Sequence, residues 1–181
     1  MAENRLKDIF NETATELVIA RPALVYGQNA KGNLKTLVKA VNNLVPLPVK
    51  GIYNKRSFLF VENLVNALSF LSLHPDAGGQ SFVIADKEVI STSLLVKMLS
   101  LHLCRPDMRF NINPKALQIA TKIPCFGRKL AKMTGNMAVD IAKIRSLGWH
   151  PPFSQEIGFK IAFGLEKISD YNNLVPSKPD S

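Results

Sequence analysis

Short apolar runs alternate with helical stripes along the first half of the chain. Apolar residues at helical spacing over 6–10 predict an opening helix, which the polar stretch 13–15 breaks. The run Leu17–Ala20 is apolar, contains β-branched residues and lies between polar turns, which predicts a buried strand. We expect Arg21-Pro22 to end this strand, because proline donates no hydrogen bond to a ladder.

The same patterns predict further strands and helices downstream. Strand-like runs occur at 56–61 and 80–86, and helical stripes at 34–41, 64–71, 94–103, 140–145 and 154–168. Ser91 with Thr92, Asp140 and Ser154 stand where a side chain can cap the start of a helix. Residues 111–135 are also helical in pattern, although prolines and glycines interrupt them.

Together these elements predict an α/β protein with a parallel sheet covered by helices. Strands alternate with helices in the first half, and helices dominate the second half. Two or three strands are few for a doubly wound sheet, so we expect the sheet to be incomplete in this chain. Residues 171–181 are expected to form a flexible tail.

The composition is that of an ordinary globular protein. Hydrophobic residues make up 46% and charged residues 20% of the 181 positions, which excludes collagen, coiled coil and disorder as the main state. Cys104 and Cys125 are too few for a disulfide scaffold and too isolated for zinc, so we expect small buried apolar side chains there. No apolar run reaches the roughly 20 residues of a membrane span, and residues 1–12 lack the apolar core of a secretory signal. A reduced, cytoplasmic protein is expected.

The formal net charge is +9, and most of it falls in one stretch. Residues 104–145 contain nine basic and two acidic side chains. Such a region can attract a phosphorylated ligand, an anionic membrane or nucleic acid. A solvated face of basic helices is the simpler interpretation, because the stretch has little of the aromatic interleaving that single-strand binding uses. We therefore expect no nucleic-acid partner.

Common catalytic and phosphate-binding motifs are absent from the sequence. It contains no Gly-x-Gly-x-x-Gly loop, P-loop, Gly-x-Ser-x-Gly elbow or His-Glu-x-x-His pair. None of its tyrosines has a lysine four residues later, and its histidines lie far apart without an obvious carboxylate partner. The residues alone therefore predict a basic α/β chain with no visible catalytic set and no metal site.

Several short motifs, taken in order, nevertheless resemble a known family. They are RPALVYG (21–27), KGNLKTL (31–37), NKRSFLFVENLVNAL (54–68), QSFVIAD (80–86), STSLLVKML (91–99) and VDIAKIRSLGWHPPFSQEIGF (139–159). Their order and spacing resemble the extended short-chain dehydrogenases, which include nucleotide-sugar epimerases, dehydratases and 4-keto reductases. Within that family, the motifs most resemble the bacterial enzymes of surface-polysaccharide synthesis that are similar to UDP-glucose 4-epimerase and UDP-N-acetylquinovosamine dehydrogenase.

The resemblance implies that this chain is the C-terminal half of such an enzyme. In the family, a Rossmann half with the NAD loop and a catalytic Tyr-x-x-x-Lys precedes the RPxxVYG strand, and Ala2-Glu3-Asn4-Arg5-Leu6 resembles the segment just after that lysine. A truncated or split gene, or an internal start, would explain this. Residues 1–27 would then be the last helix and strand of the Rossmann core and 28–170 the substrate lobe, with 57–86 returning to the Rossmann sheet. This chain would carry no catalytic residue of its own.

The resemblance also implies site residues on four segments. A strand end would meet the nicotinamide of NAD, a helix start and an arginine would hold the sugar-nucleotide diphosphate, and an extended segment would lie along the uracil. These residues are Pro22 and Val25 for the cofactor, and Asn33, Leu34, Pro48, Val49 and Arg56 for the substrate. The simpler alternatives are a plain helix cap at Asn33, a surface ion pair of Arg56 with Glu62, and packing rather than substrate stacking for Trp149.

Three functions stay open at this stage. The first is the substrate lobe of an NAD-dependent enzyme that moves a hydride at C4 of a UDP-sugar, as an epimerase, a dehydratase or a 4-keto reductase. Its partners would be the UDP-sugar and a separate Rossmann half or a second copy of the chain. The second is a basic binding module without turnover, and the third is a decayed fragment without a stable fold.

Overall fold

The computed structural model describes residues 2–10, 13–28, 33–111, 113, 135–163, 166–167 and 169–171. The helices are α1 (Ala2–Phe10), α2 (Asn33–Asn42), α3 (Val61–Leu73), the 3-10 helix η1 (Pro75–Ala77), α4 (Thr92–His102), α7 (Ala142–Ser146) and α8 (Gln155–Ala162). The strands are β1 (Ile19–Pro22), β2 (Leu24–Tyr26), β3 (Arg56–Phe60), β4 (Ser81–Ile84) and β5 (Val89–Ile90). The chain therefore has the alternating α/β order that its sequence predicts.

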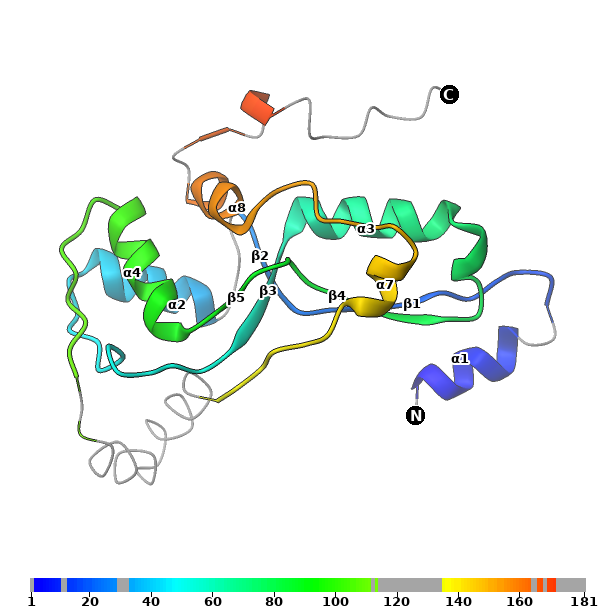
Figure 1. Ribbon diagram of the computed structural model, residues 1–181, viewed down its shortest axis with the longest axis horizontal. Coiled ribbons are helices and arrows are strands. Elements are labelled where there is room, and N and C mark those ends of the chain that lie inside the picture. The colour runs from blue at the N-terminus through cyan, green and yellow to red at the C-terminus, as the bar shows by residue number, and fades with distance from the viewer. Residues whose placement is uncertain are drawn as a thin grey trace.

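Two small sheets share one stretch of chain. β1 pairs in parallel with β4, with Ile19 opposite Ser81, and β2 pairs in parallel with β3, with Leu24 opposite Phe58. Between the two, the amide of Ala23 donates to the Ile84 carbonyl at 2.8 Å, so residues 19–26 pass from one sheet to the other. Figure 1 shows β1 and β4 at one end of the molecule, with α3 and α7 beside them, and α2 with α4 at the other end. The predicted parallel α/β architecture is confirmed.

The first strand differs from its prediction. It covers Ile19–Pro22 rather than Leu17–Ala20, and its last two residues are exposed. Within the described residues β1 pairs on one side only, with β4. Proline is tolerated there because an unpaired strand edge needs no donor. The same one-sided pairing explains why β1 is only partly buried.

Two hydrophobic clusters form the core. The first contains Tyr26, Phe58 and Phe159 and joins β2 and β3 to α2, α4 and α8. The second contains Phe82 and Trp149 and joins α3 and β4 to α7. Trp149 is buried in this cluster, and its indole nitrogen donates to the Asn66 side chain at 2.9 Å. The interpretation of Trp149 as a packing residue is confirmed.

The predicted caps follow the sequence closely. The Ser91 hydroxyl accepts from the amide of Leu94 at 3.0 Å, and Ser154 caps α8 in the same way. A carboxylate oxygen of Asp140 accepts from the amide of Ala142 at 2.8 Å, at the first residue of α7. These polar side chains satisfy amides that the first turn of a helix leaves unpaired.

Some expectations fail or lie beyond the described residues. Cys104 is exposed, with a positive φ of 50° in the turn after α4, so its predicted burial is wrong. A residue in such a turn faces solvent because no further element covers it. α8 ends at Ala162, earlier than predicted. Cys125, nearly all of the helical pattern 111–135 and residues 172–181 lie outside the described residues.

Candidate functional site

The segment Leu47–Lys50, here named the strap, is held along residues 108–110. The prediction that this segment is extended is wrong beyond Leu47, because residues 48–51 form a turn. The amide of Leu47 donates to the Met108 carbonyl at 3.1 Å, and the amide of Lys50 donates to Phe110 at 3.2 Å. Phe110 in turn donates to the Leu47 carbonyl at 3.0 Å. Each proline restricts only the residue before it, so the prolines at positions 46 and 48 do not prevent this turn.

The strap has few free backbone donors. The amide of Val49 donates to the Leu47 carbonyl at 2.9 Å, and Pro48 has no amide hydrogen. No described residue donates to the Pro48 carbonyl. The carbonyls of Leu47, Val49 and Lys50 already accept hydrogen bonds. Within the described residues, a ligand lying along the strap would therefore meet the Pro48 carbonyl as an acceptor.

The predicted strap residues differ in exposure. Val49 is only 1% exposed and packs in the first core cluster, so its side chain cannot contact a ligand. Pro48 is half-buried. Any contact of Val49 with a substrate would thus pass through its backbone.

Arg56 is the first residue of β3, close to the strap in sequence. It is half-buried, and burial lowers the pKa of its guanidinium. Its backbone lies opposite Ile90 of β5 on one side and Met137 on the other. A partly desolvated guanidinium in a fixed strand is well suited to hold a carboxylate or phosphate.

Asn54 fixes the chain between the strap and Arg56, and the sequence patterns missed it. Its buried amide group donates to the Thr92 hydroxyl at 3.1 Å and to the Gly135 carbonyl at 3.0 Å. Its carbonyl oxygen accepts from the amide of Thr92 at 2.8 Å. This one side chain ties the start of β3 to the first residue of α4, so Arg56 has a defined position relative to that helix.

The other predicted site residues lie at element ends. Asn33 begins α2, and its side chain is not among those described. Leu34 is 7% exposed and belongs to the same core cluster as Val49 and Ile90. In Figure 1, α2 begins in the same region of the view as β5 and the start of β3. The side chain of Leu34 is therefore a packing group.

The two predicted cofactor residues lie at the junction of the sheets. Pro22 ends β1 and is exposed, whereas Val25 lies in β2 and is half-buried. Because β1 and β4 are parallel, Pro22 lies at their carboxyl edge, opposite Ile84. Open α/β sheets bind nucleotides at this edge.

A buried polar network, also missed by the sequence patterns, links α3 and β3 to the segment before α8. The amide nitrogen of Asn63 donates to an Asp86 carboxylate oxygen at 2.7 Å and to the Phe153 carbonyl at 2.9 Å. Both carboxylate oxygens of Asp86 accept from the amide of Phe60 at 3.1 Å. Burial raises the pKa of Asp86 to about 6, although these hydrogen bonds act in the opposite direction.

Other kinds of site are not evident in the described part of the chain. A cavity of about 390 Å³ lies between α1 and the Gly78-Gly79 turn, away from the strap and Arg56. No group of three or more metal-ligating side chains occurs among the described residues. Among those same residues, no helix combines the length and hydropathy needed to cross a bilayer.

Parallel strands covered by helices, with an anion-suited arginine and an open carboxyl edge, define a partial Rossmann-type α/β protein. No protein-family model matches the chain. It is 33% identical over 163 residues to the UDP-glucose 4-epimerase of Vibrio cholerae, an alignment that covers 88% of this chain and 49% of that protein.

Solved structures agree on the fold. The UDP-glucose 4-epimerase of Thermotoga maritima, solved with UDP-glucose, superimposes with a TM-score of 0.62 at 17% identity and covers 91% of this chain and 52% of that one. The dTDP-glucose 4,6-dehydratase of Bacillus anthracis, solved with NAD, superimposes with a TM-score of 0.64 at 14% identity. This match covers 96% of this chain and 51% of that one. The chain belongs to the NAD-dependent nucleotide-sugar epimerase and dehydratase family of extended short-chain dehydrogenases. It spans about half the length of these relatives.

Proposed function

We propose that this chain is the substrate-binding half of an NAD-dependent nucleotide-sugar epimerase or dehydratase. The observation that carries the proposal is the fixed placement of the strap and Arg56, which only residues 51–55 separate. Asn54 anchors this connection through three hydrogen bonds, two with Thr92 of α4 and one to the Gly135 carbonyl. A carbonyl acceptor at Pro48 and a partly buried cation at Arg56 thus lie close together in the chain, as a nucleoside diphosphate requires.

The strap favours a base that offers a hydrogen-bond donor. Its amide hydrogens are donated within the protein, which leaves the Pro48 carbonyl as an acceptor. Uracil carries an N3–H donor between two carbonyl groups, whereas N3 of cytosine is an acceptor. The Pro48 carbonyl can also accept from the N4 amino group of cytosine, so we base the choice of a uridine nucleotide on the relative that is a UDP-glucose 4-epimerase.

Arg56 and the start of α2 would hold the diphosphate. Arg56 supplies a permanent charge, and the start of α2 supplies the positive end of its helix dipole. Burial has already removed part of the hydration shell of Arg56, as its lowered pKa indicates. Its attraction to an anion is correspondingly less screened than at a fully exposed site.

NAD fits this chain only in part. The exposed carboxyl edge at Pro22 is suited to its nicotinamide end, and bound NAD would accept and return a hydride. The sequence has no Gly-x-Gly-x-x-Gly loop and no Tyr-x-x-x-Lys motif. A separate Rossmann half would supply these groups, and we expect this chain alone to be inactive.

Binding of UDP, UDP-glucose and NAD to the purified chain, measured by calorimetry and thermal melting, tests the proposal. UDP and UDP-glucose should bind and raise the melting temperature, whereas NAD alone should have no effect. Arg56→Met should weaken UDP binding at least about tenfold, because one charged contact is worth that much. Arg145→Met, the same change at an exposed position on α7, should leave binding unchanged.

Three results would contradict the proposal. The first is no UDP binding, and the second is an equal loss with both arginine variants. The third is conversion of UDP-glucose by the chain alone with NAD. Salt-sensitive binding to anionic vesicles or DNA without a UDP effect would instead support the basic binding module. Product analysis, after adding the part of the Vibrio cholerae enzyme that this chain does not match, separates epimerase, dehydratase and 4-keto reductase activity.

A further inference from the structure

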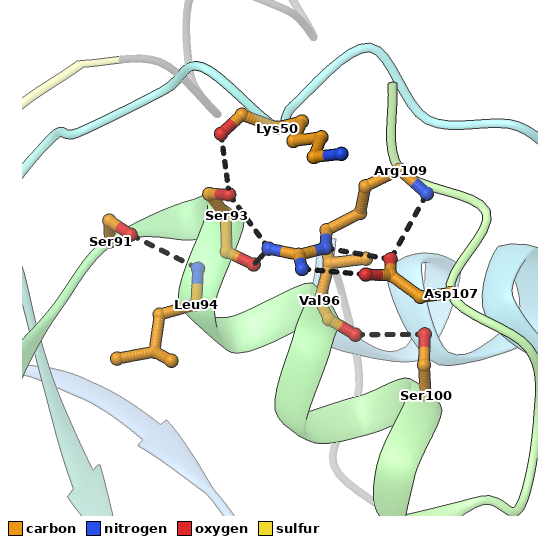
Figure 2. Close-up of polar contacts among 8 residues, drawn as sticks. All are labelled: Lys50, Ser91, Ser93, Leu94, Val96, Ser100, Asp107 and Arg109. Atoms are coloured by element: carbon orange, nitrogen blue, oxygen red, sulfur yellow. Dashed lines mark hydrogen bonds and ion pairs between the residues drawn. The ribbon is translucent and has the colours of Figure 1, made fainter. Parts of the chain in front are cut away.

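A polar cluster formed by the start of α4 and residues 107–109 contacts the strap at Lys50. It consists of Ser93, Asp107 and Arg109, shown in Figure 2. One guanidinium nitrogen of Arg109 donates to both the carbonyl and the hydroxyl of Ser93, each at 2.9 Å. The Ser93 hydroxyl then donates to the Lys50 carbonyl at 3.0 Å. A continuous chain of hydrogen bonds thus runs from Arg109 to the last residue of the strap.

Arg109 uses the remainder of its donors on Asp107. Its Nε and second terminal nitrogen donate to the two carboxylate oxygens at 2.7 and 2.6 Å, a bidentate pair. The side chain of Arg109 is only 11% exposed, so its orientation is set by these partners rather than by water. This pair lowers the pKa of Asp107 to about 2, so both groups stay charged at neutral pH.

The backbone of the same segment fixes the other end of the strap. Arg109 lies opposite Leu47, and the residues on either side of Arg109 exchange hydrogen bonds with Leu47. The strap is therefore held at Leu47 by backbone pairing, and at Lys50 by the Phe110 carbonyl together with the Ser93 hydroxyl. Between these two points lie Pro48 and Val49, the residues that would face a base.

We infer that Ser93, with Arg109 and Asp107 behind it, positions the strap and so sets the base specificity of the nucleotide site. This inference rests on the proposed function of the strap. None of the three side chains needs to touch the ligand, because each acts through the Lys50 carbonyl or the 108–110 backbone. Hydrogen bonds discriminate between bases only when the acceptors are correctly placed, and a small displacement is enough to lose them.

Ser93→Ala removes the side-chain link to the Lys50 carbonyl. It leaves the backbone hydrogen bond between Lys50 and Phe110 and the Arg109–Asp107 pair in place. Ser100→Ala is its matched control, since Ser100 is also buried on α4 but its hydroxyl donates only to Val96 of the same helix at 3.0 Å. The affinities for UDP, CDP and ADP, which share the diphosphate, are measured for each variant. With Ser93→Ala we expect about a tenfold fall in the preference for UDP over CDP and ADP, and with Ser100→Ala no change.

Arg109→Lys provides a second variant, which keeps the positive charge but lacks the planar guanidinium group with its paired N–H donors. Arg105→Lys is its control, because Arg105 lies in the same segment, is exposed and contacts only Asn42 at 3.5 Å. Arg109→Lys should lower the UDP preference as Ser93→Ala does, and Arg105→Lys should not. If the cluster has only a structural role, these substitutions should lower the melting temperature and weaken the binding of all three nucleotides by the same factor.

The outcomes separate this inference from the proposed function. If the unmodified chain does not bind UDP, the proposed function is wrong and the inference falls with it. If the unmodified chain prefers UDP and Ser93→Ala or Arg109→Lys keeps that preference, the positioning role is wrong while the proposed function stands. A loss of preference in Ser100→Ala equal to that in Ser93→Ala would also overturn the positioning role.

Discussion

Asp86 makes the stability of this protein depend on pH in a way that can be calculated. The carboxyl group is 2% exposed, and burial raises its pKa from the ordinary value of 3.8 to about 6. The amides of Asn63 and Phe60 stabilise the charged form but do not compensate for the lost hydration. The folded state therefore binds the proton of Asp86 more tightly than the unfolded state does.

The sign and size of the effect follow from this difference. A carboxyl group with a raised pKa contributes its full stability below about pH 3.8 and loses it as the pH rises through about 6. The whole loss is about 3 kcal/mol, because each pKa step of one corresponds to roughly 1.4 kcal/mol. Between pH 5 and pH 7 the expected loss is about 1 kcal/mol.

Asp86→Asn isolates this contribution. The amide oxygen of asparagine can still accept from Phe60, but the side chain has no titratable proton. Guanidinium unfolding at several values between pH 5 and pH 7 gives the free energy of unfolding of both proteins, with the exposed Asp76→Asn as a control. The unmodified chain and the control should lose about 1 kcal/mol more over this range than Asp86→Asn does. Parallel pH profiles for all three would refute the reasoning.

Other substitutions test separate features of the structure. Gly158→Ala should destabilise the fold by about 2 kcal/mol, because the new Cβ would lie 2.5 Å from the Tyr26 hydroxyl; an unchanged melting temperature would show that the ring can move. Asp107→Asn should make the stability depend less on pH between about pH 4 and pH 2. The lowered pKa of Asp107 gives the unmodified chain stability above pH 4 that is lost as the pH falls through about 2. An unchanged acid-unfolding curve in circular dichroism would contradict this. Ile9→Glu should reduce self-association in sedimentation velocity, because Ile9 is 62% exposed on α1, and identical sedimentation would show that this face is not involved.

Local features were largely predictable from the sequence. β3 and the capped starts of α4 and α8 follow from patterns within a few residues, because a cap or a side-chain period acts on neighbouring positions. The family followed from the order of motifs along the chain, and the relatives confirm it. The errors at β1 and Cys104 arise where exposure depends on which other elements lie alongside.

The candidate site needed the tertiary structure. Ser93 meets Arg109 from 16 positions away, and Asn63 meets Phe153 from 90 positions away. No local pattern marks these pairs, because a polar group finds such a partner only when packing has removed both from water. The sequence by itself thus determined the order of the elements and the family, whereas the burial of polar groups between packed elements decided which side chains hold the strap and which pKa values shift.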